Sequence, residues 1–125
     1  MNEQTEQMNN LKNNIMKTKV KILIDDLKKA NNKAKEAFKG DDGGTCNLDS
    51  VIIKLRRWSE EEIKEASVAS GVRISGKLNS NYWNGYRFLS FETKGQANER
   101  TRMTEAAYKE MRLLGYDVCM YYHAD

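Results

Sequence analysis

The 125-residue chain contains no proline, one histidine and two cysteines. Its longest apolar run near the start, residues 22–24, is far too short to cross a membrane, and no signal-peptide core precedes it. Because Cys46 and Cys119 lie far apart in apolar or β-like surroundings, we expect two buried free thiols and no disulfide. These absences predict a protein of the cytoplasm.

Residues suited to catalysis are scarce as well. His123 is two residues from the end of the sequence and has no partner at a metal-ligand spacing. The sequence contains neither a Gly-x-x-x-x-Gly-Lys phosphate loop nor a Gly-x-Ser-x-Gly elbow, and no carboxylate pair stands out. We therefore expect no enzyme activity, no metal and no cofactor.

The charges are nearly balanced, with 21 Lys and Arg residues against 18 Asp and Glu residues and a net charge of +3. A dedicated binder of duplex nucleic acid carries a denser positive field. Small or local anions are therefore the better candidate ligands. The 39% hydrophobic and 31% charged composition is typical of a single globular domain with a modest core.

An apolar seam predicts one long helix in the first third of the chain. Apolar residues alternate at spacings of four and three through Met16, Val20, Leu23, Leu27, Ala30, Ala34 and Ala37. Because the roughly 80 residues that follow are too few to cover such a helix, we expect residues 1–39 to be an oligomerisation helix. The alternative is an amphipathic helix that folds back on its own domain.

Residues 40–125 predict an α+β ligand-binding domain. Ser59 and Glu62 form a capping box that opens a short helix, and a second helix runs over residues 97–114. Alternating apolar residues indicate strands at residues 47–58, 72–78, 82–93 and 117–122, with a hairpin turn at 79–81. We expect a small mixed β-sheet packed with these two helices.

The segment 94–105 is the most informative one, because a glycine turn leads there into a helix. The first turn of that helix carries Asn98, Arg100, Thr101 and Arg102. Free backbone N–H groups and the helix dipole favour a phosphate at such a position, and guanidinium groups add bidentate hydrogen bonds. The alternative is an ordinary polar helix start with solvated arginines.

Aromatic and basic residues elsewhere extend this hypothesis to a nucleotide-like ligand. Trp83 and Phe88 belong to a cluster of rings, and aromatic faces stack well on nucleobases. Arg56 and Arg57 lie on opposite faces at the end of the first strand, where one of them can point into a pocket. Arginines would hold phosphates, while Asn98 or a C-terminal carboxylate would bind ribose hydroxyls or base edges.

Three segments carry a resemblance to a known family. They are Gly-Gly-Thr-Cys-Asn-Leu-Asp-Ser at residues 43–50, Gly-Gln-Ala-Asn-Glu-Arg-Thr at 95–101, and the ending at 115–125 with Gly-Tyr-Asp-Val and Tyr-Tyr-His-Ala-Asp. Over residues 40–125 the chain resembles the phage anti-Thoeris signal-sequestering (sponge) family, the first class of Thoeris anti-defence proteins.

The resemblance implies a function in immune evasion in the host cell cytoplasm. Members of that family bind a cyclic ADP-ribose isomer, such as glycocyclic ADP-ribose, and sequester it without cleaving it. Some members also hold cyclic oligonucleotides in a separate site. They are multimers with pockets at subunit interfaces, which implies a homo-oligomer, dimer or hexamer, for this chain.

The resemblance also implies positions for the ligand. Phe88 or Trp83 would lie on the adenine, and Arg57 and Asp125 would complete the site. Tyr122 is a further candidate ligand-binding residue. The residues expected near the pyrophosphate are Asn98, Arg100 and Arg102. A competing hypothesis is a small nucleic-acid or partner-protein binding module of a mobile element, although interleaved acidic residues argue against strong duplex binding.

Overall fold

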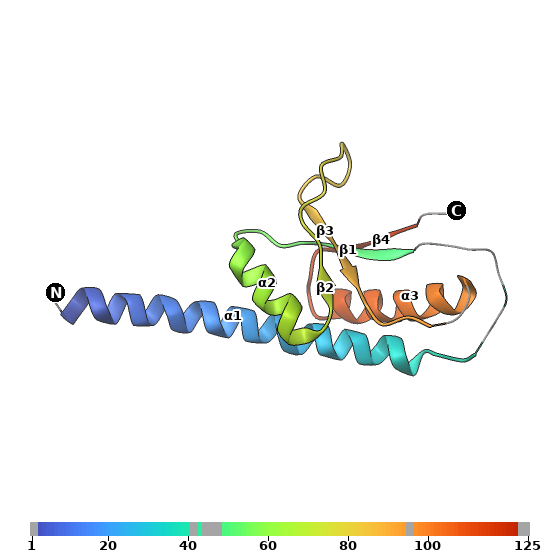
Figure 1. Cartoon of the computed structure of the whole chain (residues 1–125), viewed down its shortest axis with the longest axis horizontal. Coiled ribbons are helices and arrows are strands. Elements are labelled where there is room, and N and C mark those ends of the chain that lie inside the picture. The colour runs from blue at the N-terminus through green and yellow to red at the C-terminus, as the bar shows by residue number, and fades with distance from the viewer. Residues whose placement is uncertain (1–2, 41–42, 44–48, 95–96, 123–125) are drawn as a thin grey trace.

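The computed structural model describes residues 3–40, 43, 49–94 and 97–122, with side chains from residue 18 onward. Along the chain the elements are α1 (Glu3–Glu36), β1 (Ser50–Lys54), α2 (Glu60–Ser70), β2 (Arg73–Ile74), β3 (Tyr86–Ser90), α3 (Ala97–Leu113) and β4 (Val118–Tyr121). The α+β class, the long first helix and the order of the elements confirm the sequence prediction (Figure 1).

The four strands form one sheet in the order β2-β3-β1-β4. All of the described pairings are antiparallel, so the expectation of a mixed sheet was wrong. The connection through α2 leaves room for one strand between β1 and β2. β3 occupies this place and pairs antiparallel with both of them. In the same way β1 separates β3 from β4. Together the elements from β1 to β4 form a split βαβ arrangement.

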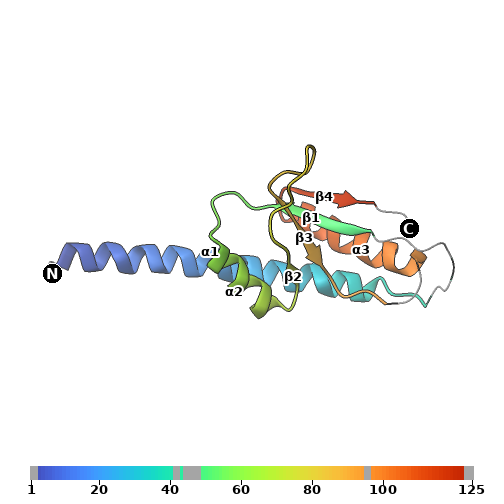
Figure 2. The same cartoon turned by 45° about the horizontal axis from the view of Figure 1, so that its top comes forward.

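The helices cover one face of the sheet, as Figure 2 shows with the sheet above α1 and α3. Side chains alternate along a strand, so Val51 and Ile53 of β1 face the helices while Ile52 faces away. Val51 and Ile53 join the main core with residues of all three helices. We call the opposite side, which carries Ile52, the outer face.

The second half of α1 belongs to this core. The expected seam is confirmed at Val20, Leu23, Leu27, Ala30 and Ala34, all of which are buried. Because α2 and α3 cover these residues within one chain, the folded-back alternative describes this half of the helix. Among the described residues, one core therefore includes residues from both sides of residue 39. Ala37 is half-buried, and the side chain of Met16 lies outside the described part.

The first half of α1 projects past the other elements in both views (Figures 1 and 2). With 34 residues the helix is about 50 Å long. It lies beside α2 and α3 along only part of that length. Self-association through the projecting half remains a prediction.

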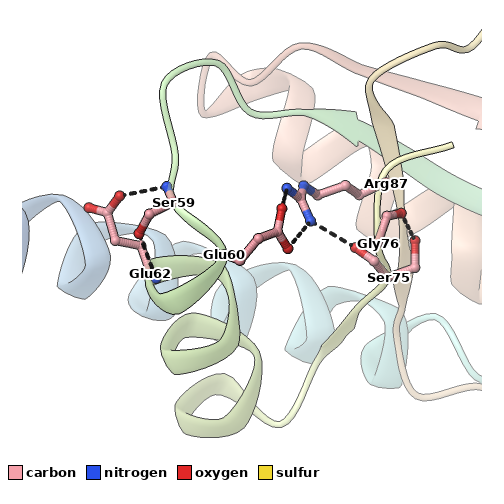
Figure 3. Close-up of polar contacts among 6 residues, drawn as sticks. All are labelled: Ser59, Glu60, Glu62, Ser75, Gly76 and Arg87. Atoms are coloured by element: carbon pink, nitrogen blue, oxygen red, sulfur yellow. Dashed lines mark hydrogen bonds and ion pairs between the residues drawn. The ribbon is translucent and has the colours of Figure 1, made fainter.

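Two polar clusters fix α2 against its surroundings (Figure 3). Ser59 and Glu62 form the expected capping box, with Ser59 Oγ accepting the Glu62 N–H at 3.1 Å and Glu62 accepting the Ser59 N–H at 2.8 Å. The fully buried Arg87 of β3 donates to both carboxylate oxygens of Glu60 and to the carbonyl of Ser75. This bond to Arg87 holds the pKa of Glu60 below its usual value.

The strands around the expected hairpin are shorter than predicted. β2 comprises only Arg73 and Ile74, and β3 begins at Tyr86. Residues 75–85 form a loop instead, in which Ser80 Oγ accepts the Trp83 N–H at 2.9 Å. Local side-chain bonds of this kind compete with strand pairing. Trp83 therefore lies in a loop and not in a strand.

Candidate functional site

The start of α3 is occupied by the protein's own carboxylates. Glu99, in the first helical turn, is fully buried and accepts hydrogen bonds from the backbone N–H of Lys39 and, at 2.8 Å, from Arg102. The Asn98 N–H donates to the carbonyl of Gly43 at 3.2 Å. A carboxylate is favourable at a helix N-terminus for the same reason as a phosphate. Glu99 and the Gly43 carbonyl thus occupy part of the position where a phosphate was expected.

Arg100 faces a different environment from Arg102. Its Nε is buried and has no hydrogen-bond partner within the described part of the chain. The residue lines a small cavity of about 60 Å³, the volume of about two water molecules. The other polar residues that line the cavity are Asp49, Ser50, Ser90, Thr93 and Thr104.

Asp49 gives the cavity an acceptor beside this cation. Its side chain is buried, and its Oδ2 accepts a hydrogen bond from Thr101 Oγ1 at 2.7 Å. The cavity therefore combines an arginine donor, a carboxylate and several hydroxyl groups. Such a set can bind a phosphate through Arg100 and ribose hydroxyls through Asp49.

Phe88 and Trp83 lie away from this cavity, on the side of the sheet that the helices leave uncovered. Phe88 contacts Tyr121 of β4 edge-on, with ring centroids 5.3 Å apart. Trp83 contacts Tyr86 edge-on at 5.6 Å. The Tyr86 hydroxyl donates to Asp117 at 3.0 Å, and burial together with this bond raises the pKa of Tyr86 to about 12.

Arg56 and Arg57 follow the end of β1 farthest from the start of α3. Arg56 forms an exposed ion pair with Asp117 at 3.5 Å. Arg57 has a left-handed backbone with φ of 64°, and its carbonyl accepts a hydrogen bond from Lys19 Nζ at 2.8 Å. The left-handed residue marks the corner where the chain turns from β1 into α2.

Tyr122 lies at the opposite end of the sheet, close to α3. Its hydroxyl donates to Glu105 at 3.3 Å, and loss of hydration and the charge of Glu105 raise the pKa of Tyr122. Asp125 and His123, and with them most of the 43–50 segment, lie outside the described residues. Among the residues that are described, no group of three His, Cys, Asp or Glu side chains could hold a metal ion.

The predicted residues that the structure describes therefore do not lie in one pocket of a single chain. Asn98, Arg100 and Arg102 share the start of α3, on the helix side of the sheet. Phe88 lies on the outer face, and Trp83 and Arg56 lie near its far end.

Sequence reasoning missed two contributors, Asp49 and Glu99. Both are acidic residues in polar surroundings, which is typical of solvated positions. Asp49 contacts Thr101 of α3, and Glu99 contacts Lys39 beyond the end of α1, so tertiary packing buries both. The Thr101–Asp49 bond joins residues 52 positions apart, a separation that no local pattern indicates.

No protein-family model, curated protein or solved structure matches this chain. None of the helices in the described ranges is long and apolar enough to cross a membrane.

Proposed function

We propose that this protein binds cyclic nucleotide immune signals and sequesters them without cleaving them, which blocks Thoeris-type immunity in the cytoplasm of a phage-infected cell. The ligand class is a cyclic ADP-ribose isomer such as glycocyclic ADP-ribose, or a cyclic oligonucleotide. The protein acts as a homo-oligomer, a dimer or a hexamer, and it is not an enzyme.

The observation that carries this proposal is the buried Nε of Arg100, which has no partner among the described groups and lies at a polar cavity. An arginine N–H without an acceptor is costly when buried, and a phosphate oxygen is its best acceptor. Asp49 in the same cavity adds an acceptor for ribose hydroxyls. A nucleotide carries both of these groups.

The size of the cavity supports an oligomeric site. About 60 Å³ admits a phosphate-sized group but not a whole cyclic nucleotide. The base must lie outside, and aromatic residues such as Phe88 or Trp83 of a second copy would stack on it there. Binding at micromolar affinity requires about 8 kcal/mol, which charge-assisted hydrogen bonds and one or two stacked rings can supply.

The test is a calorimetric titration of glycocyclic ADP-ribose into the parent protein and into Arg100→Ala. Loss of the guanidinium should weaken binding by about 1.5–3 kcal/mol and leave the melting temperature nearly unchanged. Arg100→Lys should restore binding only in part, because the ammonium loses the planar fork. Arg112→Ala, an exposed position near the end of the same helix, is the matched control.

Three outcomes count against the proposal. If Arg100→Ala binds the ligand as tightly as the parent, the phosphate site is not at α3, and the Arg56–Arg57 pair is the next candidate. Linear product recovered after heating the complex would make the protein an enzyme. If the protein binds no cyclic nucleotide at all, the proposal is wrong. Arg102→Ala is a poorer test, since it removes a partner of the buried Glu99.

A further inference from the structure

The outer face of the sheet carries an unusual concentration of aromatic side chains. Strand alternation and register place Tyr86 and Phe88 of β3 there, with Tyr121 of β4 beside them. Ile52 of β1 lies between Phe88 and Cys119 and is fully buried, although it does not belong to the core under the helices. The outer face is therefore a second, smaller apolar surface with partly exposed rings.

The order of residues along β3 is that of a base-stacking strand. Sheet-based RNA-recognition modules carry the pattern Lys/Arg-Gly-Phe/Tyr-Gly/Ala-Phe-Val-x-Phe/Tyr on one strand of a four-stranded sheet, and its aromatics stack on bases. Residues 84–91 read Asn-Gly-Tyr-Arg-Phe-Leu-Ser-Phe. The glycine and all three aromatic positions agree, and Leu89 is aliphatic like the valine, whereas Asn84 stands at the position of the basic residue. Phe91 is buried in the core under the helices, so Tyr86 and Phe88 are the two rings of this strand that face outward.

The main departure from that pattern does not affect the outer face. Arg87 replaces a small residue, but its side chain points to the helix side and binds Glu60 and Ser75 (Figure 3). Tyr86 and Phe88, two residues apart on the strand, lie about 7 Å from each other on the opposite side. Two successive bases can therefore stack on one ring each. β1 adds no ring, since Ile52 and Lys54 occupy its outward positions.

Two basic side chains, Lys54 and Arg56, lie around Tyr86 with one acidic side chain, Asp117, which accepts a hydrogen bond from the Tyr86 hydroxyl. Lys54 Nζ lies 5.7 Å from the centroid of the Tyr86 ring, on the outer face. Arg56 is exposed, and its surface pair with Asp117 is weak enough to exchange for a phosphate. From Gly71 to Phe91 the sequence contains no acidic residue, and two of its three basic residues, Arg73 and Lys77, are exposed, while Arg87 is buried and paired with Glu60.

The loop from residue 75 to 85 extends this surface. It rises from the sheet away from the helices in both views (Figures 1 and 2). Tyr82 of this loop is 88% exposed, and three asparagines lie close to it in the sequence. Amide side chains can bond base edges as donors and as acceptors.

We propose that the outer face of the sheet binds single-stranded RNA, with bases stacked on Tyr86 and Phe88 and the backbone passing Lys54. A flat sheet reaches only bases that are unstacked from a duplex, so double-stranded RNA is not a ligand. Within one chain this surface is separate from the Arg100 cavity. It includes Phe88, which the proposed function assigns to the base of a cyclic nucleotide, so RNA and that ligand would compete for this ring.

The experiment is fluorescence anisotropy of the full chain with a fluorescein-labelled single-stranded RNA of about eight nucleotides. Phe88→Leu keeps the apolar bulk beside Tyr121 but removes stacking, so the dissociation constant should rise at least about fivefold. Phe88→Tyr keeps the ring and should bind as the parent does. Tyr86→Leu and Tyr86→Phe form a second matched pair at the neighbouring ring.

Four results would overturn the inference. They are tight binding by folded Phe88→Leu and Tyr86→Leu, equal affinity for an RNA duplex, equal affinity for single-stranded DNA of the same sequence, and loss of RNA binding in folded Arg100→Ala. The last result would place the RNA at α3. Conversely, a parent protein that ignores glycocyclic ADP-ribose but binds the RNA would reject the proposed function and leave this inference in place.

Discussion

Individual polar residues join α1 to the rest of the molecule across long stretches of sequence. The Tyr116 hydroxyl donates to Asp26 Oδ2 at 2.6 Å, and Asp26 is buried in the side of α1. Burial and this bond raise the pKa of Tyr116 well above its usual value. Lys29 Nζ lies 3.9 Å from Asp26 Oδ1, and the lysine side chain is largely exposed. Tyr116 is therefore the closer partner of Asp26.

Replacing Tyr116 with Phe should therefore destabilise the fold. The substitution removes one hydroxyl and leaves a buried carboxylate with one bond fewer, which costs about 1–3 kcal/mol of unfolding free energy. Urea unfolding followed by circular dichroism measures this loss. Tyr82→Phe, at an exposed loop position, should change nothing. Equal stability of the two variants would mean that the Tyr116–Asp26 bond contributes no net free energy.

At the scale of elements, local patterns predicted what local physics determines. The α2 capping box and the alternation of side chains along β1 are confirmed. The antiparallel sheet was not predicted, because strand order depends on contacts between distant segments. Arg87 illustrates this limit of sequence prediction. A buried arginine is unfavourable in a core unless it is paired, and its partner Glu60 comes from α2.

The candidate site was predictable only in part for the same reason. The arginines at the start of α3 follow from sequence, since a glycine turn before a helix is a local signal. Their different partners do not follow, because Glu99 and Asp49 reach them through tertiary packing. The length of α1 predicted an uncovered seam, yet α2 and α3 cover it from Val20 to Ala34.

The two halves of α1 should respond differently to truncation. Deletion of residues 1–17 removes the projecting turns and should leave the melting temperature nearly unchanged. Deletion of residues 1–39 removes five buried core residues and should prevent folding, so it cannot serve as a test of oligomerisation. Thermal denaturation and sedimentation of both forms make the comparison.

Sedimentation also tests self-association through the projecting half. If that half joins copies, the shorter truncation should sediment as a smaller species than the full chain. A full chain that is monomeric at every concentration would reject the oligomerisation helix. A shorter truncation that unfolds would show instead that residues before Thr18 support the core.

For the whole molecule, three tyrosines predict how stability depends on alkaline pH. The pKa values of Tyr86, Tyr116 and Tyr122 are all raised above 10.0, that of Tyr86 to about 12. The folded chain therefore holds these protons more tightly than the unfolded chain does. Their stabilising contribution is fully present below pH 10 and is lost as the pH rises towards 12.

Urea midpoints measured between about pH 9 and pH 12 should accordingly be constant at first and then fall. The double variant Tyr86→Phe, Tyr116→Phe should start lower and show a shallower decline, because fewer raised groups remain to ionise. A parent midpoint that stays constant up to pH 12 would contradict the assigned shifts.

The packing of α1 has a consequence for synthesis on the ribosome. α1 is made first, but Asp26 meets Tyr116 only after 90 further residues, and Lys39 meets Glu99 after 60. At typical translation rates this delay lasts roughly 5–20 s. Until α2 and then α3 have been made, Val20, Leu23 and Leu27 are not fully covered, so the nascent chain exposes them to chaperones or to another emerging copy.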